Sequence, residues 1–340
     1  MIEHKHGEPL ISIVMPYKNS ATTLIECIES IVAQEMSQFE LIAINDGSTD
    51  NSLAILSNIR DDRIRLVENS GSGIVCALNF GISIAKTRWI ARMDADDIMS
   101  PDRLQKQWQY LQHNQDVKCI GSKVQLFPEE NITNGMRNYI KWQNNQLTHH
   151  QIITGLLQES SLTHPSVLIE KTSLLNVHGY RQGNFPEDYD LWLRLADSNI
   201  KFGKVDASLL LWREHNEKLT RTDPRYSLDA FNSLRVQYLL SRKNIQQARR
   251  VVIWGAGRIT RKRVDMAVSM GLVIDAWIDI DPKKIGQRID GLPVLNPSIL
   301  TPETGTVILV YVNSHGAKPK IDKFLLGKGF EYGQDYFHVG

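Results

Sequence analysis

Residues 89–97 read Trp89-Ile90-Ala91-Arg92-Met93-Asp94-Ala95-Asp96-Asp97. A largely apolar run from Trp89 to Met93 leads directly into three carboxylates within four residues. Such a run is typical of a buried strand in a parallel sheet. Acids this close repel one another, and a fold tolerates them when a cation neutralises their charge. We therefore expect a strand that ends at a Mg²⁺ or Mn²⁺ site serving a diphosphate, because hard cations bind oxygen ligands and bridge to phosphates. A solvated acidic turn that caps the next helix is the alternative.

On both sides of this stretch, short apolar runs alternate with helix-like periodicity. We expect strands at Leu10–Met15, Phe39–Asn45, Arg63–Val67 and Trp89–Met93, with helices around residues 24–32, 53–59, 74–82 and 104–111. Pro16 is expected to end the first strand, and Asn19 or Ser20 to cap the helix after it. The alternation predicts an α/β fold with a mostly parallel sheet, whose ligands bind beyond the carboxyl ends of the strands. Polar clusters at Tyr17–Asn19, Asp46 and Asp94–Asp97 fall at such ends.

After about Asn216 the sequence becomes charged and helix-like, which predicts a linker there. Residues 127–163 lack a clean period, and we expect a loop and a short helix near Trp142. Later strands are expected at Pro165–Ile169, Leu209–Trp212, Val251–Trp254, Val273–Ile278 and Thr306–Val312, and a helix is expected to start near Asp188. The expected parts are an α/β domain at 1–216, a helical linker at 217–248 and a smaller Rossmann-like α/β domain at 249–340.

Composition excludes several classes of protein. The chain has 340 residues, 42% hydrophobic and 23% charged, which is ordinary for a soluble protein of two domains. Its net charge of +1 gives no basic excess, so no nucleic-acid partner is expected. Three separated cysteines indicate neither disulfides nor a zinc site. Without a signal-like start or a transmembrane-length apolar run, we expect a cytoplasmic protein. Peripheral contact with the inner membrane face and the oligomeric state stay open.

Six segments in a fixed order carry a resemblance to a known family. They are Ser12–Asn19 (SIVMPYKN), Asp46–Asp50 (DGSTD), Leu78–Ile82 (LNFGI), Asp94–Asp97 (DADD), Glu187–Trp192 (EDYDLW) and Trp212–His215 (WREH). This set resembles the family 2 glycosyltransferases, inverting sugar transferases of the GT-A fold, over roughly residues 10–216. The resemblance implies a GT-A domain that moves a sugar from a nucleotide-diphosphate donor, preferably a UDP-sugar, to an acceptor hydroxyl. Bacterial cell-surface glycan synthesis is the implied setting.

The resemblance also implies roles for individual residues. The nucleotide would lie near Pro16, Tyr17, Asn19, Asp46 and Asp94. Asp96 would ligate the metal together with Asp94 and His215, and Asp97 would lie near the sugar. Asp188 would be the catalytic base, with Glu187 as the alternative. In the implied mechanism the metal spreads the charge of the leaving diphosphate, and the base takes the proton of the attacking hydroxyl.

One segment departs from the family pattern. Many relatives carry a basic residue shortly before the Asn-x-Gly-Ile segment, where this chain has Ser70-Gly71-Ser72-Gly73. A strict preference for uridine therefore does not follow from the resemblance.

The tail contains a candidate second nucleotide site. Gly255-Ala256-Gly257 follows a strand and is similar to the start of the dinucleotide fingerprint, although Thr260 replaces the third glycine. Asp279 ends the next strand, where a ribose-binding acid belongs. A tight turn without a ligand is the alternative. NAD(P) is disfavoured because the tail has no second catalytic cluster, but it stays open.

Two readings of the whole protein also stay open beside an active transferase. The first is a catalytically inactive nucleotide-sugar binder or scaffold, and the second is a bifunctional enzyme with an NAD(P)-binding tail. The donor sugar is not specified by the sequence. The acceptor could be a glycan, a lipid-linked glycan or a protein.

Overall fold

The computed structural model describes residues 7–302, 305–312 and 316–340. Its internal contacts divide the chain into two compact units. The first comprises Met1–Ile152 and Ser160–Tyr226, and the second comprises Ile153–Glu159 and Ser227–Gly340. The division after Tyr226 falls inside the segment that we interpreted from the sequence as a linker.

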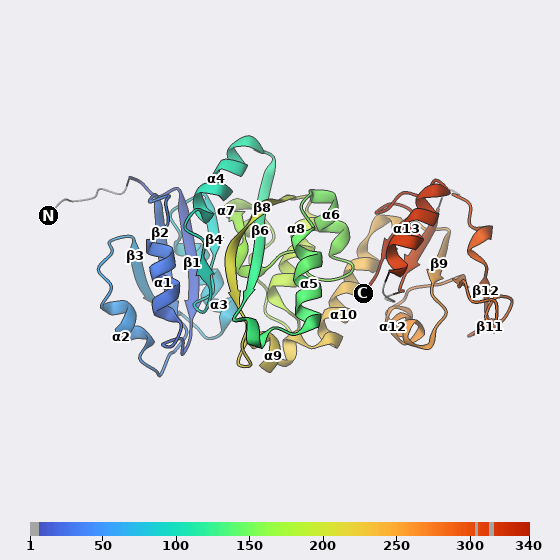
Figure 1. Ribbon diagram of the computed structural model, residues 1–340, viewed down its shortest axis with the longest axis horizontal. Helices are drawn as coiled ribbons and strands as arrows, with labels where there is room; N and C mark the ends of the chain where they lie inside the picture. Colours follow the sequence, from blue (N-terminus) through green and yellow to red (C-terminus); the bar gives the residue numbers. More distant parts are fainter. Residues whose placement is uncertain (1–6, 303–304, 313–315) are drawn as a thin grey trace. The chain divides into compact units, whose positions relative to one another are not determined.

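The first unit is built on an eight-stranded sheet with the order β3-β2-β1-β4-β7-β6-β8-β5. Figure 1 shows β3, β2, β1 and β4 of this sheet in that order from the left. Its strands are β1 (Ile11–Tyr17), β2 (Phe39–Asn45), β3 (Ile64–Glu68), β4 (Trp89–Arg92), β5 (Ile98–Met99), β6 (Val117–Phe127), β7 (Leu168–Glu170) and β8 (Lys201–Arg213). Parallel pairs join β1 to β2 and β4, β2 to β3, and β6 to β8. β7 runs antiparallel to β4 and β6, and β5 runs antiparallel to β8. The expected α/β class is confirmed.

Helices lie between these strands along the chain, as the periodicity predicts. Those that begin before residue 227 are α1 (Leu24–Val32), α2 (Ser52–Ser57), α3 (Ile74–Ile84), α4 (Arg103–His113), α5 (Asn134–Asn144), α6 (His149–Gly155), α7 (Lys171–Asn176), α8 (Glu187–Asp197) and α9 (Leu219–Thr222). In α1 the buried side chains Leu24, Ile28 and Ile31 join the core cluster that contains Ile13 and Met15 of β1. Helical spacing thus puts one apolar face of α1 on the sheet.

The prediction that Pro16 ends the first strand is wrong, because β1 continues to Tyr17. Val14 directs its carbonyl oxygen toward β4, where it accepts from Met93 N at 3.2 Å. Pro16 lies two residues further along β1, so its backbone nitrogen points to the same side, toward β4. Pairing with β4 ends at Val14, so no acceptor there needs the N–H that proline lacks.

Two long strands were missed or shortened in the sequence-based prediction. β6 was not expected, and β8 was expected only at its last residues. In β8 a buried lysine interrupts the apolar pattern: Lys204 Nζ donates to the carbonyl oxygens of Gln143 at 2.6 Å and Ser161 at 2.9 Å. The β6–β8 pairing also contains register shifts near Ser122 and Lys123, which break the period of two residues.

The second unit has a smaller sheet with the order β11-β12-β10-β9-β13-β14. Its strands are β9 (Arg250–Trp254), β10 (Ala276–Ile278), β11 (Arg288–Ile289), β12 (Leu292–Leu295), β13 (Thr306–Val310) and β14 (Tyr336–His338). Its helices are α10 (Leu228–Ser241), α11 (Lys243–Gln246), α12 (Arg258–Ser269) and α13 (Ala317–Gly327). β9 pairs in parallel with both β10 and β13, which is the Rossmann-like arrangement expected. Within the described residues, no helix is both long enough and apolar enough to cross a membrane.

Candidate active site

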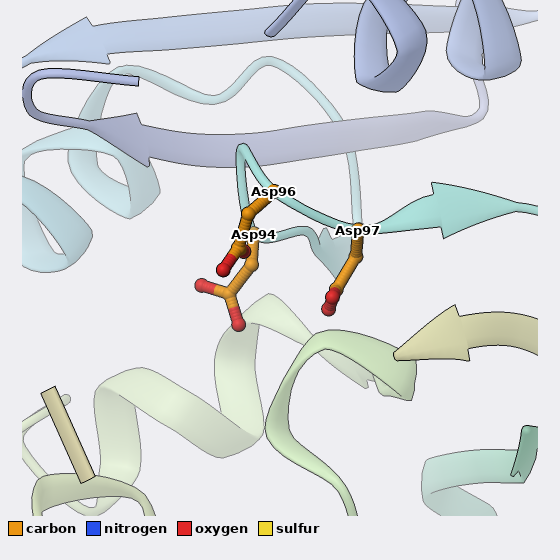
Figure 2. Close-up of side chains that lie close together, drawn as sticks. All are labelled: Asp94, Asp96 and Asp97. Carbon is orange, nitrogen blue, oxygen red and sulfur yellow. The ribbon is translucent and has the colours of Figure 1, made fainter. Parts of the chain in front are cut away.

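The acidic turn between β4 and β5 forms a compact cluster. Asp94, Asp96 and Asp97 each offer a carboxylate oxygen, and these oxygens lie within 4.8 Å of one another. Figure 2 shows the carboxylates of Asp94 and Asp96 next to each other, with Asp97 to one side. Because β4 lies in the middle of the sheet, the cluster begins at the carboxyl end of a central strand, where ligands of α/β folds bind.

A buried arginine holds Asp94. Arg92 is 3% exposed, and its Nη2 donates to Asp94 Oδ1 at 2.5 Å. The carbonyl oxygen of Arg92 in turn accepts from Arg103 Nη2 at 2.9 Å. The buried guanidinium of Arg92 needs a carboxylate partner such as Asp94, because an unpaired buried charge is costly. Arg92 therefore fixes one side of Asp94, while the side chain of Asp94 remains partly exposed on the other.

Asp96 and His215 meet across a long stretch of sequence. His215 follows β8, and its Nε2 lies 2.8 Å from Asp96 Oδ2. Burial alone would raise the pKa of Asp96, but the hydrogen bond to His215 and the charge of Lys218 outweigh burial, so this pKa is lowered. An ionised carboxylate beside an imidazole is a ligand pair suited to a divalent cation such as Mn²⁺.

Asp97 has a different environment from the other two acids. It is fully buried, and its Oδ1 accepts from the backbone N–H of Arg213 at 2.8 Å. Its Oδ2 has no hydrogen-bond partner among the described residues. Burial, together with the charges of Asp96 and Asp94, raises the pKa of Asp97 well above its ordinary value. A carboxyl group that retains its proton can donate a hydrogen bond to a ligand oxygen.

Glu187 and Asp188 lie in the first turn of α8, directly after Pro186. Asp188 is partly exposed, and its Oδ1 accepts from the N–H of Tyr189 at 2.7 Å. Burial and the neighbouring charge of Glu187 raise the pKa of Asp188 to about 7, and the charge of Asp94 adds to this shift. The pair and the acidic cluster therefore influence each other electrostatically.

Tyr226 is a site residue that the sequence did not indicate. Its hydroxyl donates to Glu187 Oε2 at 2.6 Å. Burial raises the pKa of Glu187, although the hydrogen bond from Tyr226 opposes that shift. Tyr226 lies in a 3₁₀ turn (Pro224–Tyr226) within a charged segment. No periodic pattern or motif marks such a residue, so only the folded chain identifies it.

The residues expected near the nucleotide gather at the ends of β1 and β2. Asn19 Oδ1 accepts from the backbone N–H of Thr49 at 2.8 Å, so Asn19 joins the two loops instead of capping α1, which has Thr23 at its N-cap. Asp46 Oδ1 accepts from Asn69 Nδ2 at 2.6 Å and from Gly73 N at 2.9 Å. Asn69, which we did not predict, thus holds Asp46 in place.

Pro16 and Tyr17 occupy the end of β1 itself. Tyr17 is 3% exposed, and its hydroxyl has no hydrogen-bond partner among the described residues. Burial, followed by the charge of Glu68, raises the pKa of Tyr17 to about 12. The phenol therefore stays neutral and keeps a donor for a ligand.

The three tail residues lie in the second unit, at the ends of two paired strands: Gly255 and Gly257 follow β9, and Asp279 follows β10. Gly255 has φ +117°, and a Cβ there would approach Val312 Cγ2 to 2.9 Å, so this turn requires glycine. Asp279 Oδ2 accepts from Ala256 N at 3.0 Å and from Lys284 Nζ at 3.0 Å. The acid expected to bind a ribose is therefore engaged by its own loop and by Lys284, a lysine that the sequence analysis did not include.

Comparisons with known families match both units. A model of the family described as "Glycosyl transferase family 2" matches residues 12–175. A model described as "CoA binding domain" matches residues 246–326.

Among curated proteins, the chain is similar to the O-antigen biosynthesis glycosyltransferase WbnJ of Escherichia coli. The two are 31% identical over 234 residues, which cover 66% of this chain and 88% of WbnJ. This chain is also 29% identical over 260 residues to the bifunctional glycosyltransferase pgtA of Dictyostelium discoideum. That match covers 63% of this chain and 34% of pgtA.

Among solved structures, the fold is similar to that of S. aureus TarS 1–349, crystallised in complex with UDP-GlcNAc. The TM-score is 0.55 at 14% identity, covering 69% of this chain and 67% of that one. The GT-A-type fold expected for the first unit is confirmed.

Proposed function

Because the chain belongs to glycosyl transferase family 2 and is therefore a glycosyltransferase, we propose that it performs a metal-dependent, inverting sugar transfer from a nucleotide-diphosphate donor to an acceptor hydroxyl. One observation carries this proposal. A single unit gathers Asp96 hydrogen-bonded to His215 and the Glu187–Asp188 pair, in which the pKa of Asp188 is about 7. A ligand pair for a cation and a carboxylate that exchanges its proton near neutral pH are the groups that this reaction needs.

The side chains present fit a divalent cation. Asp96, Asp94 and His215 would hold Mn²⁺ or Mg²⁺, since carboxylate oxygens and an imidazole nitrogen converge there. When bound, the cation supplies positive charge to the leaving diphosphate. We assign Asp97 to a hydroxyl of the transferred sugar, because its Oδ2 has no hydrogen-bond partner among the described residues.

The protein's own residues account for the proton transfer. Asp188 takes the proton of the acceptor hydroxyl as that oxygen bonds to the anomeric carbon. The bond from the anomeric carbon to the diphosphate oxygen breaks on the opposite face, and the electron pair leaves with the nucleotide diphosphate. One displacement inverts the configuration, and Glu187, held by Tyr226, stays available as the alternative base.

We propose a UDP-sugar as the donor, bound at Pro16, Tyr17, Asn19, Asp46 and Asp94. Asp46 supports this choice because a carboxylate accepts the imino N–H that uracil carries. Thymine and guanine carry a comparable imino N–H, so dTDP and GDP donors must be tested beside UDP. TarS was crystallised with UDP-GlcNAc, but that similarity extends only to the fold.

We further propose that the acceptor belongs to bacterial surface glycan synthesis and that the enzyme works in the cytoplasm, with peripheral contact to the inner membrane face. The name of WbnJ, an O-antigen biosynthesis glycosyltransferase, supports this setting. A glycan, a lipid-linked glycan or a protein fits the acceptor role.

The domain division that we propose for the chain is a transferase domain at 1–216, a linker at 217–248 and a Rossmann-like domain at 249–340.

For the tail we propose a second nucleotide site at Gly255, Gly257 and Asp279. The space around Gly257 supports it, since a Cβ there would meet no atom within 4 Å. The matching family model is named for CoA, so CoA and NAD(P) are the probes to test. Copurified NAD(P) would favour the bifunctional alternative.

The first experiment is calorimetric titration with UDP, GDP and dTDP, each with and without Mn²⁺. We expect Mn²⁺-dependent binding of UDP that Asp96→Ala abolishes, because Asp96 supplies a cation ligand. Asp116→Ala is the matched control, since this aspartate is exposed and its side chain pairs with Lys201 at the surface. Metal-independent binding that survives Asp96→Ala would move the nucleotide to the tail.

A second readout separates the active enzyme from an inactive binder. The wild type should slowly hydrolyse its UDP-sugar, and Asp188→Asn should bind UDP normally without that hydrolysis. Binding without turnover in the wild type, over a panel of UDP-sugars and acceptors, would favour the scaffold alternative.

A further inference from the structure

Lys218 is a buried cation in a place where its sequence neighbours are exposed. Its side chain is 9% exposed, whereas Glu217 is exposed and Leu219 is 47% exposed. A solvated turn would show the reverse pattern, with leucine inside and lysine outside. The position of Lys218 therefore requires a reason other than local amphipathicity.

The ammonium group of Lys218 has no hydrogen-bond partner among the described residues. Its ion pair with Glu214 Oε2 spans 3.8 Å, which exceeds hydrogen-bond distance, and its Nζ lies 4.1 Å from the centroid of the Trp212 ring. A buried ammonium with three unused donors is costly unless a ligand or water accepts from it.

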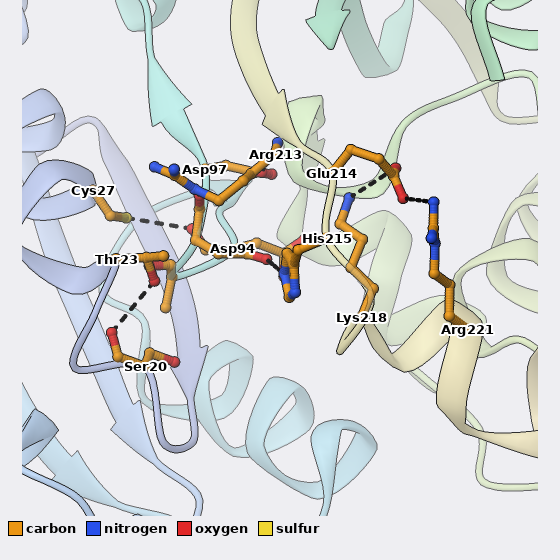
Figure 3. A network of polar contacts seen from close by, with 12 residues as sticks. Ser20, Thr23, Cys27, Asp94, Asp97, Arg213, Glu214, His215, Lys218 and Arg221 are labelled. Carbon is orange, nitrogen blue, oxygen red and sulfur yellow. Dashed lines mark hydrogen bonds and ion pairs between the residues drawn. The ribbon is translucent and has the colours of Figure 1, made fainter. Parts of the chain in front are cut away.

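Glu214 does not need Lys218 for its own neutralisation. Arg221 Nη2 lies 2.5 Å from Glu214 Oε1, so the carboxylate already has a closer cation. Figure 3 shows Lys218 and Arg221 on two different sides of Glu214. Lys218 therefore forms the longer of these two ion pairs with Glu214, and its hydrogen-bond donors are available to another anion.

Lys218 lies close enough to the acidic cluster for its positive charge to act on both Asp96 and Asp97. His215, which contacts Asp96, lies three residues earlier on the same segment. One segment thus brings a metal-ligand candidate, His215, and an ammonium without a hydrogen bond, Lys218, toward the same group of carboxylates.

We propose that Lys218 binds the diphosphate of the sugar donor by donating hydrogen bonds to its phosphoryl oxygens. This inference rests on the proposed function. A nucleotide diphosphate carries both the negative charge and the acceptor oxygens that the ammonium lacks, and charge-assisted hydrogen bonds of this kind are strong. As the sugar bond breaks and the diphosphate retains the electron pair, Lys218 balances the charge that grows on the leaving group.

The test compares Lys218→Met with Arg221→Met, both measured by calorimetry with UDP, UMP and uridine in the presence of Mn²⁺. Methionine retains most of the length of each side chain, and both variants remove a cation next to Glu214. We expect Lys218→Met to weaken UDP binding roughly tenfold to a hundredfold, the range of a hydrogen bond to a charged group. Uridine binding should stay within about twofold, and Arg221→Met should bind UDP like the wild type.

Several outcomes would overturn the assignment. Equal weakening in both variants would mean that Lys218 acts only through Glu214. Unchanged UDP binding in Lys218→Met, with wild-type binding intact, would reject Lys218 while sparing the proposed function. Failure of the wild type to bind any of UDP, GDP and dTDP would reject the proposed function and this inference with it. Thermal melting controls for folding, and Lys218→Met should melt no lower than the wild type, since it removes an unsatisfied buried charge.

Discussion

Asp188 and Asp190 lie two positions apart on α8, yet their surroundings differ. Asp190 is buried and forms ion pairs with Arg181 and Arg194, whereas Asp188 accepts one backbone hydrogen bond and lies beside Glu187. The pKa of Asp188 rises from 3.8 to about 7 because burial and the charge of Glu187 penalise its ionised form. Asp190 is thus paired with two arginines, whereas burial and the charge of Glu187 make the ionised form of Asp188 unfavourable.

This contrast predicts opposite effects on stability. A folded-state pKa above the unfolded one means that the contribution of Asp188 is fully present below about pH 4 and is lost as the pH rises through about 7. Asp188→Asn should therefore raise stability at pH 8, by on the order of 2 kcal/mol, and change little near pH 4. It should also lower the transfer rate at least a hundredfold, because the base is lost.

Denaturant unfolding at both pH values checks this prediction, with Asp190→Asn as the matched control. That variant should be destabilised at pH 8, because it leaves Arg194 without its ion pair. If Asp188→Asn lost stability at pH 8 as well, the interpretation of Asp188 as a strained base would be wrong.

The residues recognisable from sequence are those that belong to contiguous motifs. Asp94, Asp96 and Asp97 follow one strand, and the family resemblance brought His215 to them. Tyr226, Asn69 and Lys218 belong to no such motif, because their roles depend on contacts between distant segments: Tyr226 with Glu187, and Asn69 with Asp46. A single sequence contains no signal for these contacts.

At the level of elements, apolar periodicity located the strands that lie centrally in the parallel region, and it failed where a polar residue is satisfied inside the sheet. The predicted range Phe39–Asn45 equals β2, since every residue of that strand is buried. In β8, by contrast, Lys204 is buried and donates hydrogen bonds to two carbonyl oxygens. A lysine in the sequence does not indicate a buried strand, so most of β8 was not predicted. The prediction that Pro16 ends the first strand failed for a related reason. The N–H that proline lacks would point toward β4, whose pairing with β1 has already ended at Val14.

The geometry of β1 makes the tolerance for proline position-specific. Pro16→Ala should cost less than about 1 kcal/mol, since it only restores freedom to the unfolded chain. Met15→Pro should cost about 3 kcal/mol or more, because Met15 faces β2, opposite Ala43, and its N–H takes part in that pairing. Urea unfolding of the two variants measures both values, and comparable losses would contradict the account of which side Pro16 faces.

At the scale of the whole molecule, all residues proposed for sugar transfer lie in the first unit, and the tail glycines lie in the second. A change in the tail should therefore alter stability without altering donor binding. Gly255 is the sharpest place to test this, because its φ of +117° and the nearby Val312 and Thr260 leave no room for a side chain. Gly257 has an ordinary negative φ of −74° and open space around it.

We expect Gly255→Ala to destabilise the protein by about 2 kcal/mol or more, and Gly257→Ala by less than about 1 kcal/mol. Both variants should bind UDP with Mn²⁺ within about twofold of the wild type, measured well below their melting temperatures. The physical reason is that the contacts of Asp96, Asp46 and Tyr226 are all made inside the first unit. A tenfold loss of UDP affinity in Gly255→Ala, with the protein still folded, would mean that the nucleotide binds at the tail or that the two units act as one.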